Sequence, residues 1–285
     1  MGRENAVAIP PLSRGRSRRT SAPVTDPFDR KLRALRRDRA ARMGPELFLL
    51  DRAFDECLER IAAIARPFER ALLLGCPSPL WAERMGRIAA KVDVADPGPI
   101  FAARSGGVFV EEDRHDFGED RFDLCLTVGT LDTVNELPFA LTLLHRALKP
   151  DAPLVGAIAG GNSLPSLRGS LIEAERGAGR VVARTHPRIE ASSLAGLLSA
   201  AGFAMPVVDL DRVRLRYAEL TDLVRDLRGM GATSVLAQRT PALSRETFRR
   251  LAEEYRSRGA AGRTVEEIEI LHFIGWKAPL RPADH

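Results

Sequence analysis

From residue 70 onward, short apolar runs alternate with amphipathic helical patterns, and this alternation limits the folds open to the chain. The run Arg70-Ala71-Leu72-Leu73-Leu74 predicts a strand that is buried on both faces, and a helical pattern over residues 79–89 follows it after a short turn. Strands that alternate with helices across short loops form a parallel, doubly wound sheet. We therefore predict an α/β fold with a doubly wound, mostly parallel seven-stranded sheet.

The same patterns predict the other elements and the division of the chain. Further strands are expected at residues 91–96, 107–113, 121–129, 152–160, 205–217 (one strand or two) and 267–277, and helices at 27–42, 45–66, 137–149, 164–173, 192–202, 218–228 and 244–258. Residues 1–26 are rich in Pro, Ser and Arg without periodicity, which is typical of a disordered arm. We divide the rest into an N-terminal helical extension, 27–66, and a domain with helical insertions, 67–280.

The positive charge is concentrated at the N-terminal end. The chain has a net charge of +5, and residues 1–42 hold 12 basic and 4 acidic side chains, against 31 basic and 34 acidic in the remainder. The slightly acidic body argues against a nucleic-acid-binding core. The basic arm could make a peripheral contact with an anionic partner, and the alternative is a solvated tail.

Several chemistries are excluded by the residues that they need. The three cysteines and five histidines are scattered, without the spacing of a disulfide framework or a zinc site, so we expect no metal. No apolar run approaches the ~18 residues of a membrane span. Neither a phosphate-binding loop with its lysine nor a G-x-G-x-x-G fingerprint is present. We expect a protein of a reducing compartment that does not span a membrane.

Candidate binding residues follow the ends of the predicted strands. In doubly wound sheets, ligands bind at the carboxyl ends of the strands, next to the switch in strand order. The residues predicted at this edge are Gly75, Cys76, Asp96, Glu111, Glu112, Thr127 and Val128. For the acids the alternative is a solvated carboxylate at a strand end, and for Thr127 and Val128 it is simple strand packing. The sequence gives no catalytic residue.

Several stretches resemble one family within the class I S-adenosylmethionine-dependent methyltransferases, which share a Rossmann-like sheet with an antiparallel last strand. They are PFDRKLRALRRDRAA, the run from Arg121 to Glu175, RYAELTDLVRDLRGMGATS and FIGWK. These look like the complex I assembly factor five family, in its alphaproteobacterial branch, from about Phe28 to Lys277. With only four lysines, the Ala- and Arg-rich composition is typical of a bacterium with a GC-rich genome, and the expected location is the bacterial cytoplasm.

The resemblance implies a cofactor, a partner and roles for the candidate residues. The cofactor is S-adenosylmethionine, and the partner is a protein substrate, a subunit of respiratory complex I, on which arginine modification is one outcome. Asp96, with Asp93 as the weaker choice, would hold the ribose hydroxyls, and Glu111 or Glu112 would meet the adenine amino group. In the segment 164–173, Arg168 could grip a carboxylate or lie free at the surface.

The chain departs from the family at two places. The usual first motif is acid–Leu–Gly–Cys–Gly–x–Gly, but here Leu73 replaces the acid, and Pro77 and Pro79 replace the two later glycines. The prolines remove backbone donors and fix φ near −65°, which makes close approach to a cofactor harder. Asp132-Thr133 replaces a His-Trp pair. We therefore expect cofactor binding to be weakened or lost.

Three interpretations of function remain at this point. The first is an active enzyme that uses S-adenosylmethionine for methyl transfer or arginine modification of a protein. The second is a cofactor-less assembly factor that acts by binding a partner. The third is a small-molecule methyltransferase unrelated to complex I. The altered first motif leaves enzymatic activity open.

Overall fold

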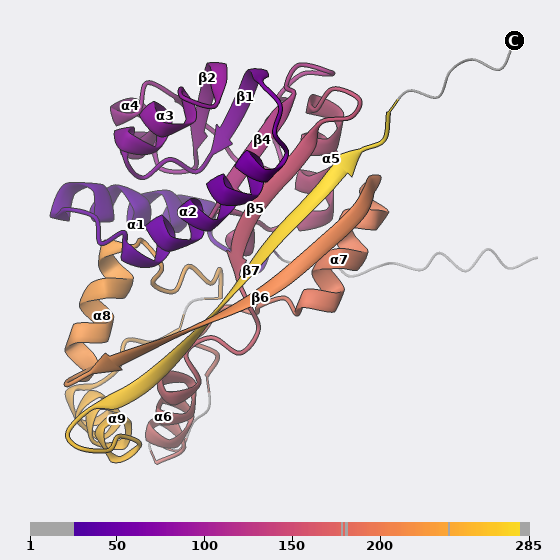
Figure 1. The fold of residues 1–285 in the computed structure, drawn as a ribbon. Helices are drawn as coiled ribbons and strands as arrows, with labels where there is room; N and C mark the ends of the chain where they lie inside the picture. The colour runs from indigo at the N-terminus through magenta and orange to yellow at the C-terminus, as the bar shows by residue number, and fades with distance from the viewer. Residues whose placement is uncertain (1–25, 178, 180–181, 239, 280–285) are drawn as a thin grey trace, which may run out of the picture.

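The computed structural model describes residues 26–279, with the exception of 178, 180–181 and 239. Seven strands of this part of the chain form one sheet in the order β3-β2-β1-β4-β5-β7-β6 (Figure 1). Their bounds are β1 Phe68–Leu74, β2 Ala89–Asp96, β3 Val108–Phe109, β4 Leu124–Val128, β5 Pro153–Ala159, β6 Phe203–Tyr217 and β7 Thr264–Lys277. β7 runs antiparallel to both of its neighbours, and β1 lies between β2 and β4. The predicted α/β fold is confirmed.

Helices cover both faces of the sheet. They are α1 Arg30–Met43, α2 Phe48–Ala63, α3 Pro79–Met85, α4 Pro99–Arg104, α5 Leu137–Ala147, α6 Pro165–Arg176, α7 Ala191–Ala200, α8 Leu220–Gly229 and α9 Arg245–Ser257. Leu73 packs into a core with α2 and α3, whereas its neighbours Leu72 and Leu74 pack into a second core with α5 and α7. The alternation of side chains along β1 explains why its sequence is apolar at every position from 71 to 74.

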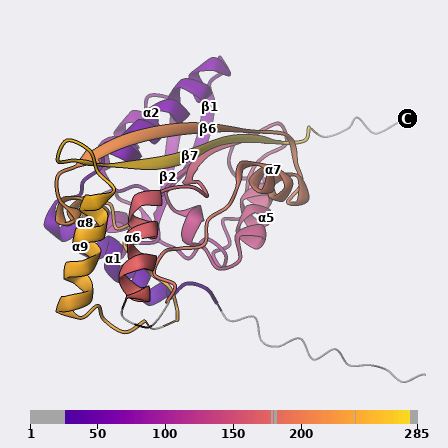
Figure 2. The same cartoon turned by 90° about the horizontal axis from the view of Figure 1, so that it is seen from below.

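The β6–β7 pair extends far beyond the rest of the sheet. These two strands continue past the end of β5, and α6, α8 and α9 gather around their far end (Figure 1). Seen from below, α6 and α9 lie side by side there (Figure 2). Residues 205–217, predicted as one strand or two, belong to one continuous strand.

One predicted strand is much shorter than expected. The sequence predicts a strand over residues 107–113, but only Val108 and Phe109 pair with β2. The backbone N–H groups of Arg114 and His115 both donate to the carbonyl of Glu111, so the chain turns immediately after the strand. The prediction is wrong here because the chain leaves the edge of the sheet after Phe109. The side chains of Glu112 and Asp113 then bind arginines of α1.

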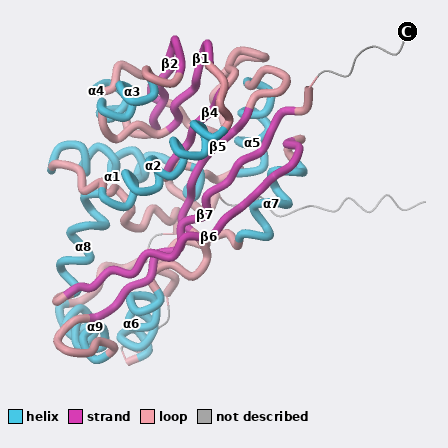
Figure 3. The backbone as a smooth tube through the Cα atoms, viewed as in Figure 1, coloured by secondary structure: helices cyan, strands magenta, loops and turns pink. Residues whose placement is uncertain are grey.

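α1 lies across the end of the sheet at which β1 and β2 finish (Figure 3). The predicted basic arm, residues 1–26, lies outside the described residues apart from Asp26. Within the described part of the chain, no helix is long and apolar enough to cross a bilayer.

The turn after β1 requires glycine, and this can be tested. Gly75 has φ +86°, and a Cβ at this position would lie 2.5 Å from Thr130 Cγ2 and 2.8 Å from the carbonyl oxygen of Val128. We expect Gly75→Ala to lower the free energy of unfolding by about 2–4 kcal/mol, through backbone strain and overpacking. Gly196→Ala is the matched control, since its Cβ meets nothing within 4 Å and it lies in α7, where alanine favours helix. Equal stability of the two variants in urea would contradict this account.

Candidate cofactor site and adjoining cavity

The loop after β1 is tied to β2. The N–H of Gly75 donates to the carbonyl of Ala95 at 2.8 Å, and the N–H of Cys76 donates to Asp96 Oδ2 at 2.7 Å. Ser78 then caps α3, which has Pro79 in its first turn. The loop therefore keeps the strand–turn–helix course of a cofactor loop. Cys76 is fully buried, and burial raises the pKa of its thiol to about 11, so the thiol is not a reactive one.

Asp96 is fully buried at the end of β2, and its carboxylate receives four hydrogen bonds. Oδ1 accepts from Gly98 N–H at 2.6 Å and from Arg37 Nε at 2.9 Å. Oδ2 accepts from Cys76 N–H and from Arg37 Nη2, the latter at 2.6 Å. Of the two candidate acids, Asp96 therefore lies beside the loop, while Asp93 bonds the surface arginines Arg70 and Arg121.

Glu112 is also fully buried and is held by Arg33 of α1. The two guanidinium nitrogens Nη1 and Nη2 each donate to one carboxylate oxygen, both at 2.7 Å. Arg33 also donates to the carbonyl of Thr130 at 2.6 Å and to Thr133 Oγ1 at 3.0 Å. Burial lowers the pKa of Arg33, but the charge and hydrogen bonds of Glu112 outweigh it, and the pKa lies above its ordinary value.

A third pair completes the contact between α1 and the sheet. Arg30 donates from both Nη atoms to the carboxylate of Asp113, and the Nη2–Oδ2 distance is 2.7 Å. Burial raises the pKa of Asp113, but the hydrogen bond from Arg30 and other donors bring it below its usual range. Arg30, Arg33 and Arg37 are spaced i, i+3, i+7, so they share one face of α1.

The structure brings most of the predicted site residues together. Gly75, Cys76, Asp96 and Glu112 line the region covered by α1. Glu111 is partly exposed and lies 3.7 Å from Arg30 and 3.2 Å from Arg114.

The remaining predicted residues have other surroundings. Thr127 is buried, with its Oγ1 3.2 Å from Thr130 Oγ1, and Val128 is buried at the wall of a cavity. Arg168 donates to the carbonyl of Gly161, which gives it a local partner rather than a bound carboxylate.

A cavity of about 120 Å³ adjoins this region at the ends of β4 and β5. Its walls are mainly apolar and come from α2, from the two strand ends, from the end of α8 and from β7. The apolar side chains are Leu49, Leu50, Ala53, Val128, Ala157, Ile158, Ala159, Leu164, Leu227, Met230, Ala232, Val235, Ile268 and Ile270. Arg33 and Arg37 contribute on the side of the cofactor loop, and Asp132, Thr133, Ser163, His186 and Arg188 add further polar groups. The cavity is thus an apolar pocket with a few convergent polar groups, as ligand sites commonly are.

The charged pair at the cavity wall, Arg188 and Asp132, is not joined by a hydrogen bond. Arg188 Nη1 lies 3.8 Å from Asp132 Oδ2, beyond hydrogen-bond distance, and burial lowers the pKa of Arg188. His186 accepts a hydrogen bond from the N–H of Val235 at its Nε2, 2.9 Å away, and its ring meets that of Phe28 edge-on. Burial lowers the pKa of His186 to about 4, so the ring is neutral near pH 7.

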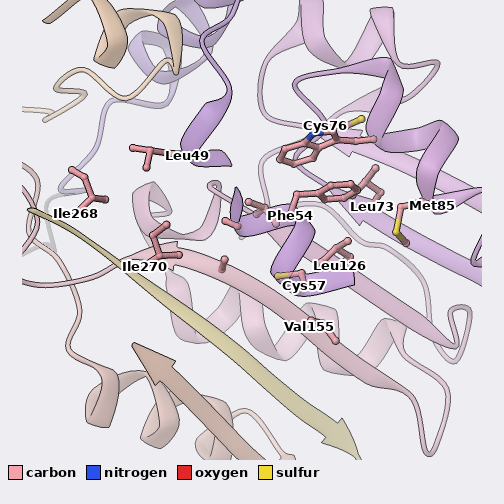
Figure 4. Packing of buried hydrophobic residues seen from close by; sticks show 14 of the residues in the cluster. Leu49, Phe54, Cys57, Leu73, Cys76, Met85, Leu126, Val155, Ile268 and Ile270 are labelled. Atoms are coloured by element: carbon pink, nitrogen blue, oxygen red, sulfur yellow. The ribbon is translucent and has the colours of Figure 1, made fainter. Parts of the chain in front are cut away.

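The residues around the loop do not fit S-adenosylmethionine in their present arrangement. Asp96 already accepts four hydrogen bonds, which leaves no lone pair for ribose hydroxyls, and Arg33 binds both oxygens of the fully buried Glu112, so an adenine amino group would have to displace it. Leu73, in the place of the family's acid, lies in the apolar cluster of Phe54 and Met85 (Figure 4). Burying a carboxylate there would carry a large desolvation cost.

Comparison with known proteins decides the family. No family model matches the chain. The mouse protein arginine-hydroxylase NDUFAF5, mitochondrial, is 33% identical, and the match covers 99% of this chain and 86% of the mouse protein. The human protein of the same name is also 33% identical, over 93% of this chain and 82% of its own length. The chain belongs to the NDUFAF5 family.

A solved structure supports the fold of this NDUFAF5 relative. A candidate methyltransferase from Bacillus halodurans superposes with a TM-score of 0.55 at 14% identity, over 78% of this chain and 98% of its own. At that identity the likeness shows the fold alone, which is that of the class I methyltransferases. Membership of the NDUFAF5 family and the methyltransferase fold confirm the sequence resemblance.

The neutral state of His186 predicts a pH effect on stability. Its pKa is about 4 in the folded chain and ~6.5 when unfolded, so the unfolded state binds the proton first as the pH falls. Stability that is fully present above pH ~6.5 is therefore lost between pH ~6.5 and pH 4. We expect this residue to account for about 1–3 kcal/mol of that loss. In His186→Gln, whose side-chain oxygen can still accept from Val235, the loss should be smaller by this amount in urea titrations. Parallel pH profiles of the two proteins would rule out this role for the histidine.

Proposed function

We propose that the chain acts on a protein substrate during the assembly of respiratory complex I, and that it receives an arginine side chain of a complex I subunit. Two observations support this proposal. Its NDUFAF5 relatives carry the name arginine hydroxylase. The cavity at the ends of β4 and β5 offers apolar walls for the methylene groups and the carboxylate of Asp132 for the guanidinium. Of the three arginines that also line it, Arg33 and Arg37 are already paired with Glu112 and Asp96.

The observation that carries the proposal is the state of Asp132. The nearest guanidinium nitrogen of Arg188 lies 3.8 Å from its carboxylate, so the carboxylate keeps capacity to accept hydrogen bonds. An incoming guanidinium can donate two parallel N–H groups to a carboxylate, which is the strongest common arrangement for this pair. In this proposal the carboxylate of Asp132 holds the substrate.

The other polar residues of the cavity would position Asp132 and the substrate. Arg188 lies 3.8 Å from the carboxylate of Asp132, close enough to orient it by charge attraction. His186 holds the segment of Val235 in place through its Nε2, and this segment forms part of the cavity wall. The residues of the chain thus bind the arginine side chain, orient it and exclude water from it. The modification we propose is hydroxylation of that arginine, in which a C–H bond is replaced by C–OH; dioxygen would supply the oxygen atom, and a two-electron reductant from outside the chain would reduce the second oxygen atom to water.

A second function is favoured by a specific observation. Because Arg37 and Arg33 occupy both oxygens of Asp96 and Glu112, the chain could act as a cofactor-less assembly factor that binds the subunit without modifying it. The same arrangement weakens the case for S-adenosylmethionine-dependent methyl transfer. Family membership speaks against the third interpretation, a small-molecule methyltransferase.

Replacement of Asp132 tests the proposal. In a strain that lacks the gene, we expect the wild-type chain to restore complex I on native gels, and Asp132→Asn to fail. Loss of charge-assisted hydrogen bonds worth about 1.5–3 kcal/mol should weaken binding of the isolated subunit by about tenfold to a hundredfold in calorimetry. Glu119→Gln, which changes an exposed acid away from the cavity, is the control.

Mass spectrometry of the subunit separates the two functions. An arginine that gains one oxygen atom only when the wild-type chain is present supports hydroxylation. Restored complex I with an unmodified arginine supports the assembly factor. Full restoration and undiminished binding by Asp132→Asn would contradict the assignment of Asp132.

A further inference from the structure

We propose that α1 is the occupant of the nucleoside half of the cofactor site, and that S-adenosylmethionine competes with α1 instead of binding beneath it. The proposal rests on the misfit between the cofactor and the paired acids, and it is independent of the arginine substrate. It makes residues 30–43 of the chain itself the ligand of Asp96 and Glu112.

The chemistry of α1 matches the acids that it covers. Arg37 presents a bidentate fork to Asp96, and Arg33 presents another to Glu112, with three of the four donor distances between 2.6 and 2.7 Å and the fourth at 2.9 Å. The Arg37 guanidinium also lies over the ring of Phe101, 5.3 Å from its centre. The planar guanidinium of Arg37 thus makes hydrogen bonds at its edge and lies with its face against an aromatic ring. A ribose and its nucleobase would use the same two kinds of contact.

The backbone of α1 packs closely on α4 and on the loop after β2. Ala40 and Ala41 are almost completely buried, and they pack against Phe101 of α4. A Cβ on Gly98 would lie 2.8 Å from the Cβ of Arg37, so the helix approaches the loop after β2 as closely as glycine allows. The N–H of Ile100 donates to Asp38 at 2.9 Å. The small side chains of α1 therefore let the helix lie close to α4 and to the loop after β2.

The two ends of α1 are attached differently. Before its first residue, Phe28 exchanges two hydrogen bonds with the side chain of Asn135, and the chain bridges to Leu236. At the other end, the carbonyl of Ala41 accepts a hydrogen bond from Arg104 of α4 at 2.6 Å, and Gly44, with φ +90°, then turns the chain toward α2. These contacts lie outside the sheet, so α1 could leave the site without breaking the pairing of the strands. The apparent cofactor affinity would equal the intrinsic affinity multiplied by the fraction of molecules in which α1 has left the site.

Calorimetry with S-adenosylmethionine tests the proposal. We expect little binding to the wild-type chain at about 1 mM cofactor, and binding to Arg33→Gln/Arg37→Gln that is at least about tenfold tighter, because the competing forks are lost. Arg39→Gln is the matched control, since Arg39 lies on the exposed face of the same helix. The proposal is overturned if the wild-type chain binds as tightly as the double variant, or if neither binds while both are folded by circular dichroism.

A second experiment avoids a variant that leaves buried acids without their arginines. A protease site inserted in the exposed connection 44–47 allows α1 to be cut from the otherwise complete chain after folding. Cleavage should permit cofactor binding, and a synthetic peptide of residues 26–43 should reverse it. Equal affinity before and after complete cleavage would contradict the proposal. Neither experiment uses an arginine substrate, so the proposed function can stand or fall separately.

Discussion

The bidentate pair of Arg37 and Asp96 joins three parts of the molecule that are distant in sequence. Asp96 ends β2, its second oxygen fixes the N–H of Cys76 in the loop after β1, and Arg37 brings α1 over both. Breaking a buried pair by removal of one partner costs about 3–5 kcal/mol, because the remaining charge is left without compensation. The loop, the helix above it and the shape of the neighbouring cavity all depend on this contact.

The position of α1 also determines the cavity in which we place the substrate. Arg33 and Arg37 form part of its wall, and the segment before α1 holds Phe28 against His186. Through the N–H of Val235, His186 holds the segment after α8. A movement of α1 would therefore open the cofactor site and change the substrate cavity together. This coupling gives the basic helix ahead of the methyltransferase fold a physical role in this chain.

The sequence predicts those parts of the structure that depend on local pattern. Alternating burial along β1 defines a central strand, and Gly75 and Asp96 occupy the ends of strands where the fold requires a turn and an acid. The arginines of α1 could not be assigned in this way, because a basic helix is normally solvated and the acids that pair with Arg33 and Arg37 lie 79 and 59 residues away. Their i, i+3, i+7 spacing is the one signal in the sequence that indicates a shared face.

The cavity has no comparable signal in the sequence, because His186 and Arg188 come from a loop without periodicity. The predicted strand 107–113 is longer than the observed β3, because its acids pair with arginines of α1 that are distant in sequence, and a local pattern cannot indicate such pairing.

Hydrogen–deuterium exchange of α1 in the wild-type chain, without S-adenosylmethionine and with it at a concentration high enough to saturate the site in calorimetry, tests the central claim most directly. If the cofactor competes with α1, the amides of residues 30–43 will exchange faster when the cofactor is bound, because the helix has left Asp96 and Glu112. If these amides exchange more slowly, α1 closes over a bound cofactor as a lid, and the claim that the two compete is wrong.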